Sequence, residues 1–280
     1  MASTTPPPLA DLPLARQLER AEAVSSARFV EARRRAADSR AEWIECGGAV
    51  ALYDGAESPA TQTFCLGLFE AASEETLERL ERFFFERGAA AHHEVSPLAG
   101  IECFQLLQQR GYSLVELSSV MYRTLEAPPS PPEGVRVSLA QPEEADLWAQ
   151  IAADGWRDVA PDLYEWIRQI GEATARKEES PCFLAWIEGR PVAAAGLSLL
   201  PPVAHLAGAS TIPEARRRGA QQALLEARLR YAAEHGCALA LMGAAPGSAS
   251  QRNAERQGFR IAYTRLKWRL PCPATAASGA

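Results

Sequence analysis

Apolar and polar residues follow two different periods in the second half of the chain. Three apolar runs, over residues 182–189, 190–200 and 202–211, are broken by Glu-Gly and Pro-Pro pairs, which is typical of an antiparallel meander of strands. The apolar positions then recur every three to four residues, which predicts a helix that ends at Gly236. A buried strand, a short helix and an alternating strand are predicted next, over residues 237–245, 248–258 and 259–270.

Two helical patterns, over residues 142–156 and 161–179, precede this meander. The first has acidic residues in its opening turn, where they interact favourably with the helix dipole. With a strand before them, the elements run strand, two helices, three strands, helix, strand, helix, strand. This order predicts an α/β fold in which a mixed parallel and antiparallel sheet is flanked by helices.

The first half of the chain resembles the end of the second. After a helix over residues 11–37, a second helix ends at Gly88, a third ends at Gly111, and an alternating strand follows. The helix-ending glycines are 23 residues apart here (88 to 111) and 22 residues apart in the second half (236 to 258). Shared order and spacing favour a tandem duplication. Chance similarity of two α/β segments is the alternative.

A proline-rich segment separates the two halves. Residues 128–134 read Pro-Pro-Ser-Pro-Pro-Glu-Gly, and four prolines cannot sit inside a helix or a central strand. This segment is therefore interpreted as a linker between two domains, residues 1–127 and 135–272.

Composition narrows the possible functions. The net charge is −6, which argues against broad nucleic-acid binding, and no apolar run is long enough to span a membrane. Six scattered cysteines show neither a disulfide framework nor metal-ligand spacing, and the amino terminus has no secretory pattern. A cytoplasmic protein with reduced cysteines and no metal is expected, as a monomer or a homodimer.

The segment that carries chemistry joins the third meander strand to the next helix. Three consecutive arginines, Arg216 to Arg218, are followed by Gly219. The first amides of a helix have no intrahelical partner and attract anions, and glycine lets a phosphate approach the backbone closely. The segment thus predicts a phosphate site, with a solvated basic turn as the alternative. G-x-G-x-x-G and the lysine-bearing phosphate loop are both absent.

This segment resembles the acetyl-CoA signature of the GNAT superfamily of N-acetyltransferases, Arg/Gln-x-x-Gly-x-Gly/Ala. Arg216 to Gln221 follow that pattern, and Gln257-Gly258-Phe259 resembles the Leu-Gly-Phe that closes the last helix of the family. Gln221 departs from the pattern because a small residue usually stands there. The resemblance covers about residues 135–270 and implies two GNAT-like domains in tandem, with acetyl-CoA as co-substrate.

The resemblance also implies roles for individual residues. Thr211 and Ile212 would offer main-chain bonds to the pantetheine arm, and the pyrophosphate would be held by Arg216, Arg217, Arg218, Gly219, Ala220, Gln221 and Gln222. The tyrosine that often protonates the leaving thiolate is replaced by Ala254. Asn253 and Ser250, three residues apart on one helix face, are candidate donors and candidate helix caps. His205 is a candidate base and Tyr263 a further candidate acid, with packing roles as their alternatives.

The aligned segment of the first half, residues 71–80, has carboxylates and no glycine. Because negative charge repels a pyrophosphate, this half is expected to be a degenerate copy without CoA. The predicted function is transfer of an acetyl group from acetyl-CoA to an amine by direct attack, with a small molecule or a peptide as acceptor. A non-catalytic CoA-binding or structural pseudoenzyme is the alternative, and a nucleic-acid binder is disfavoured.

Overall fold

The computed structural model describes residues 8–35, 39–125, 134–175 and 180–273. Within these ranges the chain forms two compact units. The amino-terminal unit comprises residues 8–120, 244–248 and 261–273, and the carboxyl-terminal unit comprises residues 121–243 and 249–260. No helix in the described part of the chain combines the length and the apolar character that crossing a membrane requires.

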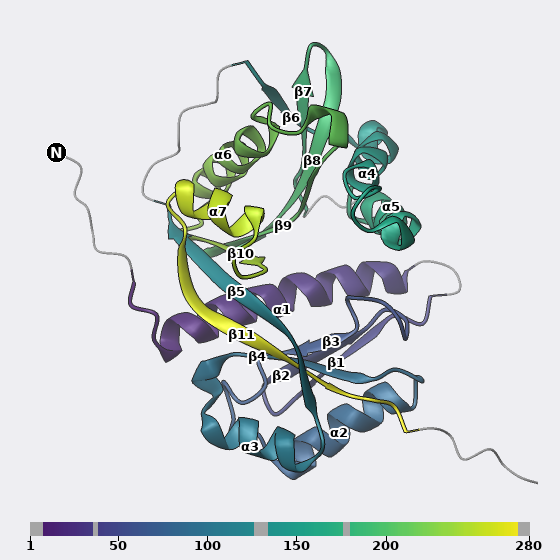
Figure 1. The fold of residues 1–280 in the computed structure, drawn as a ribbon, viewed down its shortest axis with the longest axis vertical. Helices are drawn as coiled ribbons and strands as arrows, with labels where there is room; N and C mark the ends of the chain where they lie inside the picture. The colour runs from purple at the N-terminus through teal and green to yellow at the C-terminus, as the bar shows by residue number, and fades with distance from the viewer. Residues whose placement is uncertain (1–7, 36–38, 126–133, 176–179, 274–280) are drawn as a thin grey trace, which may run out of the picture. The chain divides into compact units, whose positions relative to one another are not determined.

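The amino-terminal unit is a mixed sheet with helices on both faces (Figure 1). Its strands lie in the order β1-β2-β3-β4-β11-β5. Helix α1 packs on one face of this sheet, and α2 and α3 pack on the other. The elements of this unit are α1 (Leu12–Arg34), β1 (Glu42–Cys46), β2 (Ala49–Tyr53), β3 (Gln62–Phe64), α2 (Glu74–Phe85), β4 (Ala91–Val95), α3 (Ile101–Gln109), β5 (Ser113–Thr124) and β11 (Arg260–Leu270).

A buried charge cluster fixes the last strand, β11, in the amino-terminal unit. Arg265 of β11 is 4% exposed and pairs with Glu19 (3.3 Å) and Glu22 (2.9 Å) of α1 and with Glu94 (3.0 Å) of β4. Burial raises the pKa of Glu19 to about 7, while the positive charge of Arg265 opposes that rise. This cluster links two ends of the chain that are more than 240 residues apart.

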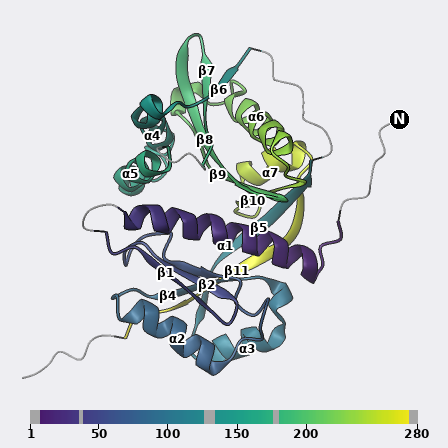
Figure 2. The same cartoon turned by 180° about the vertical axis from the view of Figure 1, so that it is seen from behind.

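The carboxyl-terminal unit has the strand order β10-β9-β8-β7-β6 (Figure 2). Strands β6 to β9 are antiparallel neighbours, and β10 is parallel to β9. Helix α4 packs on one face of β7 to β9 with α5 against it, and α6 packs on the other face. The elements are β6 (Arg136–Leu139), α4 (Ala145–Asp154), α5 (Tyr164–Ala175), β7 (Cys182–Ile187), β8 (Arg190–Leu200), β9 (Val203–Thr211), α6 (Ala220–Glu234), β10 (Leu239–Ala244) and α7 (Ala249–Arg256).

Most elements predicted from the sequence are present, including the meander, which is β7 to β9, and the helices that end before Gly88, Gly111, Gly236 and Gly258. The α/β fold class with a mixed sheet is confirmed. The strands β1, β2 and β3 were not predicted.

The residue ranges of the two units differ from those of the predicted domains, 1–127 and 135–272. Residues 261–273 belong to the amino-terminal unit, and residues 121–125, which include the end of β5, belong to the carboxyl-terminal one. Strand β11 pairs with β4 over five residues, which accounts for the place of residues 261–270 in the amino-terminal unit. Of the predicted linker, residues 128–133 lie outside the described residues.

Candidate functional site

The β9–α6 loop, residues 212–219, ends in a helix start that has no side-chain cap. Gly219 is the N-cap residue of α6, with φ +85° and ψ −5°, a left-handed conformation that glycine adopts without strain. The first intrahelical bond of α6 runs from the amide of Ala223 to the carbonyl of Gly219 (3.0 Å). The amides of Ala220, Gln221 and Gln222 therefore have no carbonyl of the preceding turn to bond to, which makes this helix end suited to an anion.

The three arginines of the loop have different environments. Arg216 donates two hydrogen bonds to Asp158 (2.6 and 2.7 Å) and one to the carbonyl of Gly155 (2.9 Å). The bond from Arg216 holds the pKa of Asp158 below its usual value. Arg218 pairs with Glu188 (2.8 Å). Arg217, at φ +64°, is exposed and has no ion pair with any residue of the described ranges.

The structure thus gives Arg216 a structural task that the sequence did not predict. Its bidentate bond to Asp158 attaches the β9–α6 loop to the segment after α4, while Arg217 remains available to an incoming anion. Gln221, which departs from the family pattern, donates from Nε2 of its side chain to the hydroxyl of Thr211 (2.8 Å). This bond turns the Gln221 side chain back onto the end of β9.

Strand β9 parts from β10 just before the loop. The parallel register joins β10 to β9 only from Leu239 opposite Val203 to Leu241 opposite His205, although β9 continues to Thr211. Over the same stretch β9 carries a bulge relative to β8, and Ala207 and Gly208 there are exposed. An unpaired strand edge therefore leads directly to the positive end of α6.

The predicted main-chain contacts are only partly available at this edge. The amide of Ile212 donates to the carbonyl of Val192 on β8 (3.0 Å), so it is already occupied. Because the polar groups of a strand alternate between its two neighbours, the main chain of Thr211 points the other way, toward the open edge. Its carbonyl there accepts from Nε of Arg216 (3.4 Å).

Comparison with known proteins identifies this arrangement. Residues 145–259 match the model of the acetyltransferase (GNAT) family. These residues form a GNAT domain. The matched stretch contains the β9–α6 loop, the open edge of β9 and helix α7.

The fold of the whole chain is similar to that of solved GNAT structures. A GCN5-related N-acetyltransferase from Kribbella flavida is 18% identical, covers 89% of this chain and 95% of its own, and superposes with a TM-score of 0.61. A tandem GNAT protein from the clavulanic acid biosynthesis pathway is 14% identical, covers 96% and 98% of the two chains, and gives a TM-score of 0.60. No curated protein sequence matches the chain significantly. The tandem GNAT fold predicted from the repeat is therefore confirmed.

The candidate catalytic residues of the GNAT domain are not all brought together. Asn253 and Ser250 lie on α7 with exposed side chains, and Ala254, next to Asn253, is buried. Asn253 is the fifth residue of α7, so it is not an N-cap, and the capping alternative is excluded for it. His205 is 8% exposed and lies in the middle of β9, between Ser198 of β8 and Leu241 of β10.

Tyr263 lies outside residues 145–259, the stretch that matches the family model. It lies on β11 in the amino-terminal unit, where its hydroxyl donates to Glu19 (3.0 Å). Burial and the neighbouring carboxylate of Glu19 raise the pKa of Tyr263. This contact favours a packing role for Tyr263 over a role as catalytic acid, because a buried hydroxyl bonded to a buried carboxylate is a structural contact.

In the amino-terminal half, the helix start that corresponds to the β9–α6 loop has a side-chain cap. Helix α2 begins at Glu74 and is capped by Ser73, whose hydroxyl accepts from the amide of Thr76 (3.2 Å). Glu74 and Glu75 occupy its first turn. A capped helix start with two carboxylates disfavours a phosphate, and the absence of CoA from this half stays a prediction.

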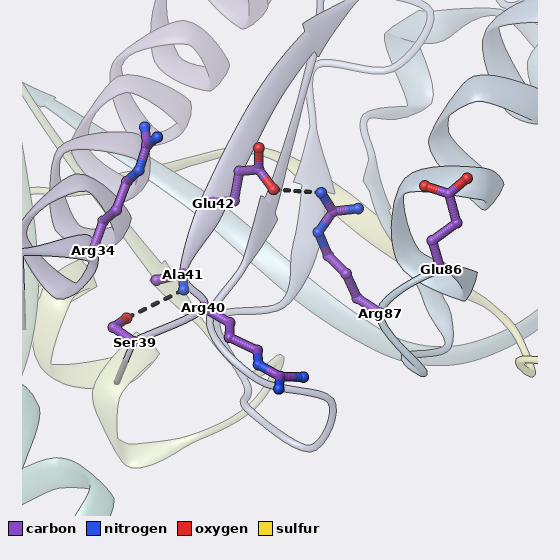
Figure 3. A pocket seen from close by; sticks show the side chains of 7 residues that line it. All are labelled: Arg34, Ser39, Arg40, Ala41, Glu42, Glu86 and Arg87. Carbon is purple, nitrogen blue, oxygen red and sulfur yellow. Dashed lines mark hydrogen bonds and ion pairs between the residues drawn. The ribbon is translucent and has the colours of Figure 1, made fainter. Parts of the chain in front are cut away.

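A separate cavity of about 500 Å³ lies in the amino-terminal unit (Figure 3). Arg87 within it is bound to Glu42 and donates to the carbonyl of Phe83 (2.7 Å), and Glu86 points away from the arginines. The cavity has none of the features of the GNAT site, and we assign it no role. Within the described ranges, no cluster of three or more His, Cys, Asp or Glu residues could hold a metal ion.

Proposed function

We propose that the chain binds acetyl-CoA in its GNAT domain and transfers the acetyl group to an amine. The observation that carries this proposal is the start of α6, where left-handed Gly219 and exposed Arg217 adjoin three amides that have no intrahelical acceptors. The pyrophosphate would bind to the amides of Ala220, Gln221 and Gln222. Successive amides in such a turn form the concave arrangement that holds anions elsewhere in proteins.

The open edge of β9 suits the remainder of the co-substrate. An extended pantetheine arm would bond to the main chain of Thr211, and the thioester would reach the bulge at Ala207 and Gly208. An amide of the bulge could there polarise the thioester carbonyl. The amine nitrogen attacks the carbonyl carbon, the carbon–sulfur bond breaks, and the amine loses a proton while the thiolate gains one.

Asn253 is the residue we propose as the hydrogen-bond donor to the departing thiolate. It stands next to Ala254, where related enzymes often have a tyrosine, and its exposed side chain makes no hydrogen bond to any described residue. An amide is a weaker acid than a phenol and would stabilise the thiolate without protonating it. Ser250, one turn away on the same face, is the second donor.

Release of free CoA from acetyl-CoA, measured with and without a panel of amines, tests the proposed function. The proposal expects release that depends on the amine, with an acetylated amine as the second product. The absence of a tyrosine at position 254 favours a second candidate, a protein that binds CoA without turnover. Binding with no amine-dependent release from a broad panel of small amines and peptides would support that candidate and contradict the first.

Replacing Asn253 by alanine separates a catalytic role from a structural one. We expect turnover to fall about tenfold, which corresponds to the loss of roughly 1.4 kcal/mol of transition-state stabilisation. The melting temperature should change little, because the side chain is exposed and is not a cap. Glu255→Ala on the same helix removes only an exposed bond to Gln251 (3.0 Å) and serves as the control. A lowered melting temperature with unchanged turnover would assign Asn253 a purely structural role.

A further inference from the structure

Arg228 is a buried arginine without a carboxylate partner. It lies on the face of α6 that packs on the sheet and is 4% exposed. No ion pair joins it to any residue in the described part of the chain. Burial lowers the pKa of Arg228 to about 10, so the side chain still carries its charge at neutral pH. An unpaired buried charge is costly, and a leucine or methionine would fill the same space without that cost.

The hydrogen bonds of Arg228 lead to the bulge of β9. Its Nε donates to the carbonyl of Leu224 (3.2 Å), and its Nη1 donates to the carbonyl of Gly196 on β8 (3.1 Å). Gly196 lies opposite Ala207, at the point where the β8–β9 register shifts. The pairs Ala194–Ser210 and Gly196–Ala207 enclose one more residue on β9 than on β8, which places the extra residue at positions 208–209.

The Gly196 carbonyl lies at this bulge and accepts the bond from Arg228. On the other side of β8, the amide of Leu197 donates to the carbonyl of Pro181 (3.0 Å), so the polar groups of Gly196 point toward β9. The extra residue of β9 shifts the register there, and Arg228 donates to the Gly196 carbonyl at that point. A shorter or uncharged side chain could not hold the Leu224 and Gly196 carbonyls together.

We propose that Arg228 is a positioning residue for acyl transfer, which holds the bulge of β9 open through Gly196 and places a positive charge next to the thioester. The proposal rests on the function proposed above, in which the thioester lies at this bulge. Neighbouring strands are about 4.8 Å apart, so the Arg228 charge, held against Gly196 of β8, acts on the bulge of β9 over about one strand spacing in a medium of low dielectric constant. No carboxylate neutralises it, and it therefore stabilises negative charge that develops on the thioester oxygen in the transition state.

The test compares two substitutions of Arg228 with a core substitution on the same helix. Arg228→Gln keeps one donor and loses the charge, and Arg228→Lys keeps the charge with a different donor geometry. Leu229→Ala removes a fully buried apolar side chain of α6 and controls for lost stability. CoA affinity is measured by calorimetry, and kcat and KM for acetyl-CoA are measured with an amine that the unmodified chain acetylates.

We expect Arg228→Gln to lower kcat by at least about tenfold while CoA affinity stays within about threefold, because the phosphate contacts are elsewhere. Arg228→Lys should retain more than half of the kcat by which Arg228→Gln falls short of the unmodified chain. Leu229→Ala should lower the melting temperature and leave kcat unchanged. A folded Arg228→Gln chain with unchanged kcat would overturn the inference, as would equal losses in Arg228→Gln and Leu229→Ala. If Arg228→Gln fails to fold, the kcat of Arg228→Lys decides the role of the charge. A kcat below a tenth of that of the unmodified chain would overturn the role. A kcat above this limit, with CoA affinity unchanged, would support it. An unmodified chain that neither binds CoA nor acetylates amines would refute the proposed function itself.

Discussion

Replacing Gly219 by tryptophan is expected to abolish CoA binding while the chain still folds. A Cβ atom at this position would meet only the Cγ2 atom of Val135, at 3.8 Å, so the protein itself leaves room for a side chain. The indole would instead occupy the space over the amides of Ala220 to Gln222, which the pyrophosphate needs. We expect affinity to fall by at least about 100-fold, equivalent to roughly 2.8 kcal/mol.

The matched control is Gly236→Trp, at the other end of α6. Gly236 also has a positive φ, +81°, and no atom lies within 4 Å of its Cβ position. Both substitutions therefore impose a left-handed backbone on tryptophan, at a cost of about 1–2 kcal/mol. The control should show a comparable fall in melting temperature with normal CoA affinity. Unchanged CoA affinity in a folded Gly219→Trp chain would exclude the start of α6 as the phosphate site.

Replacing Arg265 by methionine is expected to have the largest effect on stability. The substitution leaves Glu19, Glu22 and Glu94 without the cation that all three share, and Glu19 and Glu94 are buried. Removing one partner from a buried ion pair typically costs about 3–5 kcal/mol, and here three carboxylates are affected. The free energy of unfolding, measured by urea denaturation, should fall by at least about that amount.

Arg20→Met provides the comparison on helix α1. Its ion pair with Glu45 has a similar length, 2.8 Å, but both side chains are partly exposed. Exposed pairs of this kind contribute about 0–1 kcal/mol. Equal losses in the Arg265 and Arg20 variants would mean that the cluster around Arg265 does not hold β11 in the amino-terminal unit.

Local patterns in the sequence were enough to predict most of the elements. The helix-ending glycines, the meander and the Arg-Arg-Arg-Gly segment depend on neighbours within a few residues, and their physical causes are equally local. Gly219 is an example, because its conformation follows from its place between an extended loop and a helix start.

Interactions between distant residues could not be predicted in this way. Arg216 looked like one of three equivalent phosphate ligands, yet it pairs with Asp158, 58 residues earlier. Tyr263 looked like a candidate acid, and its bond to Glu19 spans 244 residues. In both cases the polar partner comes from a distant part of the chain, and no periodicity in the sequence marks that partner.

Three strands of the amino-terminal half were also missed, for a different reason. Strand β3 has only three residues, Gln62–Phe64, and β1 has only five, Glu42–Cys46, with two glutamates among three apolar residues and no regular alternation. Such short runs give weak periodic signals, and pairing with β2 stabilises both of them. Arg228 gave no signal at all, since one arginine on a helix is normally a surface residue.

Calorimetric titration of the unmodified chain with acetyl-CoA tests most directly whether the GNAT domain contains the acyl-donor site and the amino-terminal half does not. We expect one molecule of acetyl-CoA per chain, because α6 begins with unbonded amides at Gly219 while α2 begins with a serine cap and two glutamates. Two equivalent sites per chain would contradict the degeneracy of the amino-terminal half. No binding at millimolar acetyl-CoA would contradict the phosphate site at the start of α6.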